Sequence, residues 1–323
     1  MPEEKRPRPA DANAITRKYL DSILIEQRLV GAHTPSLRCQ LFGRLFETPV
    51  MMPAFSHLHI FAKERKDAIC EYARAAKALG ALNFVGMCED ADFARILETG
   101  APTVRIVKPY ADRSKIRSQL AFARTHGALA VGMDIDHSFS TSGGFDTVFG
   151  EEMAPCSGAE LADFIHAAGL PFLVKGVLSV RDVLACAEAG AQAILVSHHH
   201  GRMPFAVPPL MVLPDIVKAV GGKMKIFVDC GIESGADVYK ALALGADAAA
   251  VGRSILAPLV RDGASGVEAY IRHVNEELAM LMAFTGCATL ADPEPSVLWH
   301  KGRPMCQRPY ANSEIFPWRS HEN

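Results

Sequence analysis

Three consecutive histidines, His198–His200, are the first feature of the sequence that could do chemistry, and Gly201 and Arg202 follow them directly. They come immediately after an apolar run that ends in Ser197. Neighbouring residues of an extended segment point to opposite sides, so three imidazoles in a row cannot easily converge on one metal ion. No glutamate or further histidine stands beside them at a metal-like spacing. The pattern favours one catalytic histidine with two neighbours, and we expect no metal site.

Further charged residues stand at the ends of other apolar runs. They are Asp134, Lys175 and Asp229. Each of them, taken alone, is explained equally well as a residue that caps a loop. Their recurrence at equivalent positions favours a shared active site instead, and a carboxylate beside a histidine makes that histidine a stronger base. Asp134 is the expected partner of a catalytic His199.

Glycines after the last two apolar runs suggest an anion site. Gly231 follows one run, and the next run ends at Gly252 and is followed by Arg253. In barrels of parallel strands, phosphate groups commonly bind at the loops after strands seven and eight, through backbone amides and the N-terminus of a short helix. The Arg253 guanidinium would add a charge-assisted contact. These residues therefore predict a ligand that carries a phosphate.

The elements that must position these residues follow one rhythm, in which a short apolar run, a turn and an amphipathic helix repeat. The eight runs are 48–54, 81–86, 103–107, 128–134, 171–176, 193–197, 225–229 and 248–252. Eight strand–helix units in one chain favour a closed (β/α)8 barrel, whose chemistry lies at the carboxyl ends of its strands. An open, doubly wound sheet is the competing fold, but no GxGxxG follows the first run.

Length and composition limit the remaining possibilities. The barrel, which needs roughly 250 residues, is assigned to residues 48–290 of the 323, with an N-terminal extension over 1–47 and a tail over 291–323. A helix is expected over 15–30, and the long aperiodic segment after Asp134 is expected to be a lid or binding loop. The net charge of −2 favours no nucleic acid partner. The sequence has no secretory signal and no apolar run of about 20 residues, and its eight cysteines lack CxxC spacing. These features predict a cytoplasmic protein without membrane contact.

From Leu170 to about Leu290 the sequence closely resembles the FMN-dependent α-hydroxy-acid oxidases and dehydrogenases, such as glycolate oxidase, lactate oxidase and flavin lactate dehydrogenase. The matching stretches are LPFLVKGVLSVRDVLACAEAGAQAILVSHHHGR, FVDCGIESGADVYKALALGADAAAVGR and ELAMLMAFTGCATL. The resemblance implies a (β/α)8 barrel that binds FMN, oxidises a small 2-hydroxy acid to the 2-oxo product and assembles as a tetramer or a larger homo-oligomer.

The resemblance also implies roles for particular residues. His199 matches the base, Asp134 the carboxylate paired with it, and Arg202 the arginine that holds the substrate carboxylate. Lys175 matches the lysine beside flavin N1 and O2, where a cation would stabilise the reduced flavin. The hydride equivalent would pass to flavin N5, or, in the family's carbanion alternative, the same base would act on the α-carbon instead. The remaining positions implied to contact the cofactor are Pro53, Ala54, Phe55, Ser197, Asp229, Gly231, Gly252 and Arg253.

The sequence departs from the family's motifs at positions that bind the substrate and the phosphate group. The family's Ser-Asn-His-Gly-Gly-Arg is Ser-His-His-His-Gly-Arg here, and Asp-Gly-Gly-Ile-Arg has become Asp-Cys-Gly-Ile-Glu, which places Glu233 where an arginine would face the phosphate. A flavin-contacting glutamine, a substrate-contacting tyrosine and a second substrate arginine are missing, and Lys108 is expected to supply the second substrate charge. Two alternatives remain open, namely a non-redox flavin isomerase and a barrel that has lost catalysis and serves binding.

Overall fold

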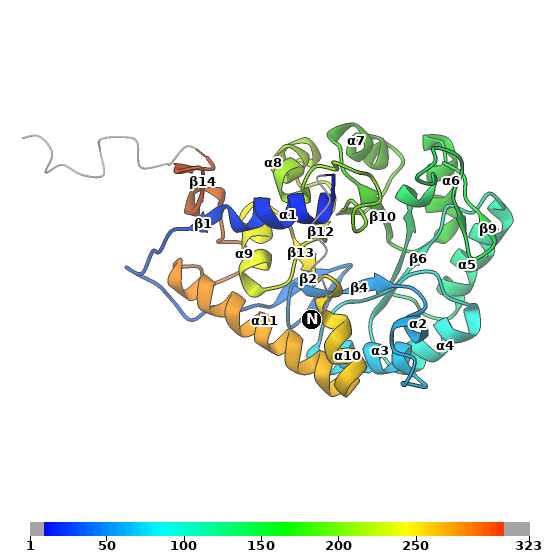
Figure 1. The fold of residues 1–323 in the computed structure, drawn as a ribbon, viewed down its shortest axis with the longest axis horizontal. Helices are drawn as coiled ribbons and strands as arrows, with labels where there is room; N and C mark the ends of the chain where they lie inside the picture. The colour runs from blue at the N-terminus through cyan, green and yellow to red at the C-terminus, as the bar shows by residue number, and fades with distance from the viewer. Residues whose placement is uncertain (1–9, 307–323) are drawn as a thin grey trace, which may run out of the picture.

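The computed structural model describes residues 10–306, and at its centre eight parallel strands form a closed barrel (Figure 1). Hydrogen bonding follows chain order and closes between the last strand and the first, where Ala249 pairs with Val50. The barrel strands are β4 (Val50–Phe55), β5 (Asn83–Val85), β6 (Thr103–Val107), β7 (Ala130–Asp134), β10 (Phe172–Val177), β11 (Ala193–Val196), β12 (Lys225–Val228) and β13 (Ala248–Ala250). All eight predicted runs form barrel strands, and the closed ring excludes an open sheet.

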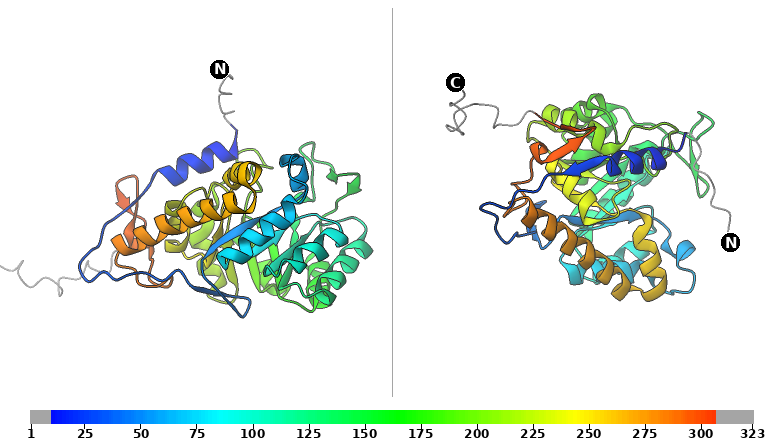
Figure 2. Two further views of the ribbon diagram at one scale, coloured as in Figure 1. Left: turned by 90° about the horizontal axis from the view of Figure 1, so that it is seen from below. Right: turned by 60° about the vertical axis from the view of Figure 1, so that its left-hand side comes forward.

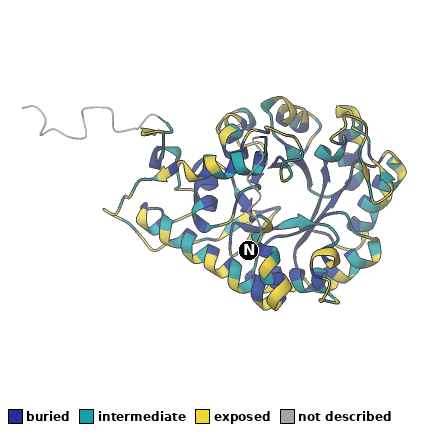
Figure 3. Ribbon diagram, in the orientation of Figure 1, coloured by how far each residue is buried: buried dark blue, intermediate teal, exposed yellow. Residues whose placement is uncertain are grey.

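Helices surround the barrel and cover its outer face (Figures 1 and 3). They are α3 (Ala68–Leu79), α4 (Asp90–Glu98), α5 (Arg113–Thr125), α6 (Gly158–Ala168), α7 (Val180–Glu188), α8 (Pro209–Val220), α9 (Gly235–Ala243), α10 (Leu256–Asp262) and α11 (Ala264–Phe284). Side chains alternate along each strand, so one set packs on the helices while Phe84, Leu173 and Phe227 fill the interior. The hairpin of β2 (Cys39–Leu41) and β3 (Arg44–Phe46) adds buried side chains to this interior cluster.

The N-terminal extension differs from the predicted helix over 15–30. Helix α1 spans Ala12–Asp21, and the Asp11 side chain accepts a hydrogen bond from the backbone N–H of Asn13 at its start. The helix ends early because β1 (Ile23–Ile25) pairs with β14 (Leu298–His300), which also pairs with β15 (Arg303–Pro304). Figure 2 shows these paired strands at one edge of the molecule, beyond the end of α1. The part of the predicted tail from 307 to 323 lies outside the described residues.

Two connections extend from the carboxyl end of the barrel, where the site is expected. Helix α2 (Leu58–Phe61) follows β4. The segment after β7 contains the 3-10 turn η1 (Ile135–His137) and a short hairpin of β8 (Thr147–Val148) and β9 (Glu151–Glu152). The 3-10 turns η2 (Arg253–Ile255) and η3 (Pro295–Val297) complete the elements. Within residues 10–306, every helix is too short or too polar to cross a membrane.

Candidate active site

A cavity of about 380 Å³ opens at the carboxyl ends of the barrel strands, the size of an ordinary small-molecule site. Residues at the ends of all eight barrel strands, or in the connections that follow them, line it, as the parallel barrel requires. The predicted site residues that line it are Pro53, Ala54, Phe55, Lys108, Lys175, His199, Asp229, Gly231, Gly252 and Arg253. Within residues 10–306, Asp134, Ser197 and Arg202 lie behind this lining. The structure therefore gathers the predicted residues at one end of the barrel.

The first strand leaves a stretch of backbone free to face the cavity. Pro53 has no N–H to donate, and the β4–β5 register is irregular between Met52 and Phe55. The Tyr72 hydroxyl, on α3, donates to the carbonyl oxygen of Pro53 at 3.0 Å and holds this irregular segment in place. The backbone at Pro53–Phe55 can therefore meet a flat ligand.

Asp134 lies under the cavity and is held by two buried lysines. Lys108 Nζ contacts its Oδ2 at 2.5 Å, and Lys175 Nζ contacts its Oδ1 at 3.1 Å. Burial alone would raise the pKa of Asp134, but His199, Lys108 and Lys175 together hold it well below its usual range. Burial lowers the pKa of Lys108, whereas the nearby carboxylates overcome burial and raise that of Lys175. Asp134 is therefore an anion that keeps two cations in place.

His199 is held through its Nδ1 atom. This nitrogen lies 2.8 Å from Asp136 Oδ1, 3.2 Å from Asp134 Oδ1 and 3.1 Å from Lys175 Nζ. Burial disfavours the imidazolium, but the two carboxylates overcome burial and raise the pKa of His199 above its ordinary value of 6.5. The predicted Asp134 partner is present, although Asp136 makes the shorter contact. With Nδ1 engaged by the carboxylates, Nε2 is the atom of His199 that can accept a substrate proton, and its neighbour in this structure is the ring of His137.

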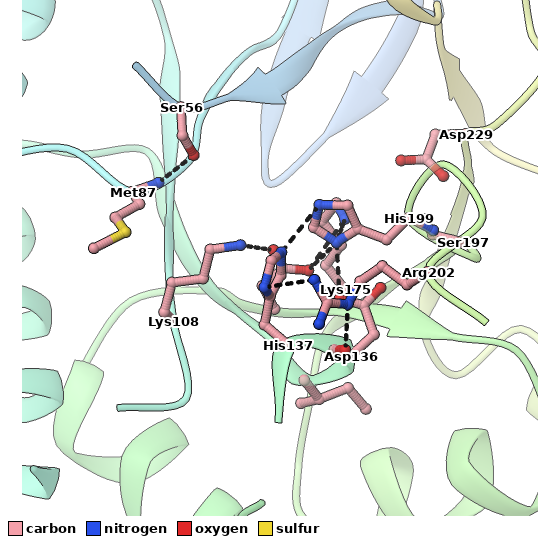
Figure 4. A network of polar contacts seen from close by, with 12 residues as sticks. Ser56, Met87, Lys108, Asp136, His137, Lys175, Ser197, His199, Arg202 and Asp229 are labelled. Carbon is pink, nitrogen blue, oxygen red and sulfur yellow. Dashed lines mark hydrogen bonds and ion pairs between the residues drawn. The ribbon is translucent and has the colours of Figure 1, made fainter. Parts of the chain in front are cut away.

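A second imidazole, that of His137, faces the first (Figure 4). The two Nε2 atoms of His137 and His199 are 3.3 Å apart, and the rings meet edge to face. His137 Nδ1 lies 3.1 Å from Asp146 Oδ2 and 3.0 Å from Arg202 Nη1. Burial, with a further contribution from the charge of Lys108, lowers the pKa of His137 to about 3, so this ring is neutral at physiological pH.

Arg202 uses its donors within the protein. Its Nη2 donates to Asp146 Oδ2 and to the carbonyl oxygen of Phe139, both at 2.7 Å, and its Nε donates to the carbonyl oxygen of Asp136 at 3.0 Å. A carboxylate ligand would have to compete with Asp146 for this guanidinium. The role of Arg202 in substrate binding, expected from the resemblance, remains a prediction.

The other two histidines of the triplet point away from His199. The backbone N–H of Gly201 donates to His198 Nδ1 at 3.0 Å, so Nε2 carries the proton and donates to Thr16 Oγ1 at 2.8 Å. His200 lines the cavity at its outer side and adopts a left-handed backbone, with φ of +56°. Neither imidazole has a hydrogen bond to the base among the described residues.

Four groups lie close enough to hold a metal ion, namely Asp134, Asp136, His137 and His199. The ammonium group of Lys175 already lies 3.1 Å from both Asp134 Oδ1 and His199 Nδ1. A lysine thus supplies the positive charge that these carboxylates need, and we assign no metal role to the group.

The opposite end of the cavity suits a phosphate group. Gly231 has φ of +74°, a conformation that favours glycine, and Gly252 leads into the 3-10 turn before α10. The guanidinium of Arg253 is exposed beside them and has no ion-pair partner within residues 10–306. One end of the cavity therefore carries the base His199 and the buried ammonium groups. The free backbone at Pro53–Phe55 lies in the middle, and Arg253 lies at the far end. This arrangement fits FMN.

Three members of the site were not predicted from the sequence, and they are Asp136, His137 and Asp146. All three belong to the segment after β7, which has no periodicity to place its side chains. The short run Asp-Ile-Asp-His at the end of β7 was the available signal, because alternate residues of an extended segment share a face.

Comparison with known proteins agrees with this geometry. The family of FMN-dependent dehydrogenases matches residues 11–147 and 141–300. An L-lactate oxidase of Lactobacillus jensenii is 30% identical over 312 residues, which cover 83% of this chain and 73% of that protein. An L-lactate oxidase of Roseobacter sp. (strain GAI101) is 44% identical over 140 residues, but these span only 38% of its length. Among solved structures, a mandelate oxidase mutant with the monooxide FMN adduct superposes with a TM-score of 0.81 at 26% identity, covering 93% of this chain and 94% of that one.

Proposed function

Because the chain belongs to the family of FMN-dependent dehydrogenases, we propose that it oxidises the CH–OH group of a 2-hydroxy acid, with His199 as the base. The observation that carries the proposal is the arrangement of His199, whose Nδ1 is held 2.8 Å from a carboxylate beside the buried ammonium of Lys175. Bound FMN supplies the acceptor for the hydride equivalent that leaves the substrate carbon. The residues that would hold FMN are Pro53, Ala54, Phe55, Lys175, Ser197, Asp229, Gly231, Gly252 and Arg253.

The protein's own part in the reaction is the movement of one proton. Nε2 of neutral His199 takes the proton of the substrate hydroxyl, and Asp134 and Asp136 stabilise the imidazolium that forms. Lys175 keeps Asp134 in place and contributes positive charge at the same end of the cavity. Since the carboxylates raise the pKa of His199, the neutral base becomes abundant only above its ordinary value of 6.5.

The walls of the cavity favour a substrate with an apolar side chain. Ile60, Phe61, Met87 and Phe149 line it, and the first two come from the short helix α2. Lys108 is the cation on this side of the cavity that replaces the family's tyrosine, and we propose that it holds the substrate carboxylate together with Arg202. We therefore expect an aryl or branched 2-hydroxy acid to be a better substrate than glycolate.

Anaerobic flavin reduction tests the proposal. Purified protein loaded with FMN should lose its yellow absorbance when mixed with mandelate or a branched 2-hydroxy acid, and more slowly with glycolate. His199→Gln should keep FMN but no longer be bleached, whereas His273→Gln, at an exposed histidine of α11, should behave like wild type. A protein that binds FMN and is bleached by none of these acids would refute the oxidation reaction, and a bleachable His199→Gln would refute the role of the base.

We also propose that the protein acts in the cytoplasm as a homo-oligomer. Seven cysteines are free thiols, which suits a reducing compartment, and they are Cys39, Cys70, Cys88, Cys156, Cys186, Cys230 and Cys287. The family resemblance favours a tetramer or larger assembly. Light scattering on a size-exclusion column tests the assembly, and a monomeric mass would refute it.

A further inference from the structure

The departures from the family's motifs at this end of the barrel lie against one element, helix α1. His198, which replaces an asparagine, contacts Thr16 Oγ1 at 2.8 Å. The carbonyl oxygen of His200, which replaces a glycine, accepts a hydrogen bond from Asn13 Nδ2 at 3.1 Å. His200 has a left-handed backbone, which is strained at a residue other than glycine and persists only when its surroundings hold it. Helix α1 therefore supports the altered loop after β11.

The third departure, Glu233, lies in the loop after β12, and Arg17 of α1 meets that same loop. Arg17 Nη1 donates to the carbonyl oxygen of Gly231 at 2.8 Å and to Asp237 Oδ2 at 3.0 Å, and Nη2 donates to Asp237 Oδ1 at 2.8 Å. The Asp237 side chain is only 2% exposed. A buried carboxylate needs a hydrogen-bonded cation, and Arg17 supplies it in a bidentate geometry.

Asp237, which is held by Arg17, in turn holds the backbone of the loop. Its Oδ2 accepts hydrogen bonds from the N–H of Glu233 at 3.1 Å and from the Ser234 hydroxyl at 3.0 Å. Arg17 and Asp237 together therefore fix the segment between β12 and α9 that carries Gly231. Figure 1 shows α1 beside α8 and α9, where it reaches both loops.

The contact between the helix and the loop is close. A Cβ atom on Gly231 would lie 2.9 Å from Thr16 Cγ2, so the helix packs directly on the backbone of the glycine. Asn13 and Arg17 also line the cavity, at the end that Gly231, Gly252 and Arg253 form. The N-terminal helix is thus part of the wall of the site.

We propose that helix α1 completes the phosphate end of the FMN site and that Arg17 is the positioning residue that compensates for the arginine lost at Glu233. Arg17 acts through Asp237 and the Gly231 carbonyl group, which hold the loop amides in place for the phosphate. The proposal rests on the proposed function only in that FMN is the cofactor.

Titration of the apoprotein with FMN and with riboflavin, followed by flavin fluorescence, tests this role. Riboflavin lacks the phosphate, so it reports on the rest of the site. Arg17→Gln should weaken FMN binding by about tenfold or more, the usual effect of losing a charged hydrogen bond, and should leave riboflavin binding unchanged. Arg17→Lys should lie between, because lysine lacks the planar fork. Lys18→Gln, at an exposed position of the same helix, is the matched control and should bind both flavins like wild type.

A charge reversal at Glu233 provides the second variant. Glu233→Arg should tighten FMN binding but not riboflavin binding, both alone and in the Arg17→Gln protein. Equal changes for both flavins, or none in either variant, would show that α1 only stabilises the fold and would overturn the proposal. A wild-type protein that binds no FMN would instead refute the proposed function, and this inference with it.

Discussion

Replacing His137 should make the protein less sensitive to acid. Its pKa is lowered from 6.5 to about 3 in the native state. Below pH 6.5 the imidazole therefore binds a proton in the unfolded chain but stays neutral in the native state. Stability contributed by the neutral ring is therefore present above pH 6.5 and is lost as the pH falls toward 3. At 1.36 kcal/mol per pKa unit, this linkage lowers the free energy of unfolding by about 2 kcal/mol at pH 5 relative to pH 8. The side chain is 12% exposed, so solvent screens little of this effect.

Urea unfolding between pH 5 and 8, followed by circular dichroism at a fixed FMN concentration, measures this difference. His137→Gln should lose about 2 kcal/mol less than wild type over this range, because glutamine does not titrate. The raised pKa of His199 adds stability that is present below pH 6.5 and is lost at higher pH. Both proteins contain His199, so its own contribution cancels in the difference between them. His273→Gln should follow the wild-type curve. Parallel curves for wild type and His137→Gln would refute the neutral, buried state of His137.

Two further substitutions test the electrostatics and the packing. Asp136→Asn removes the carboxylate that lies 2.8 Å from His199 Nδ1 and helps to raise the pKa of His199. The acid limb of the pH profile of the flavin-reduction rate should therefore move to lower pH. An unmoved limb in stopped-flow measurements would contradict this. Gly235→Ala would place a Cβ 2.4 Å from the backbone nitrogen of Leu278 and should cost about 2 kcal/mol or more in urea unfolding, whereas Gly158→Ala meets nothing within 4 Å and should be neutral or stabilising.

The barrel strands could be predicted because each strand–helix unit is a local pattern. Periodicity and glycine stops act over a few residues, and eight such units close in only a few ways. The position of the site followed from the same topology, since every parallel strand ends on the same side. Lys108, Lys175 and His199 therefore came together in the cavity as the ends of β6, β10 and β11 required.

The ends of the chain show the limit of local patterns. Helix α1 stops at Asp21 although the amphipathic pattern continues, because Ile23–Ile25 pairs with Leu298–His300. Propensity is a weak preference, and hydrogen bonds to a strand more than 270 residues away outweigh it here. A single window of sequence does not contain that information.

By itself, the sequence determined the closed barrel, the end at which its polar residues gather and the identity of most of them, because these depend on short-range pattern and on parallel topology. Only the tertiary structure decided that Asp136 and His137 join His199, that Arg202 is paired with Asp146, and that Arg17 reaches Asp237. Such contacts join residues dozens to hundreds of positions apart through side-chain directions. The protonation states follow from burial and from neighbouring charges, which exist only once the chain has folded.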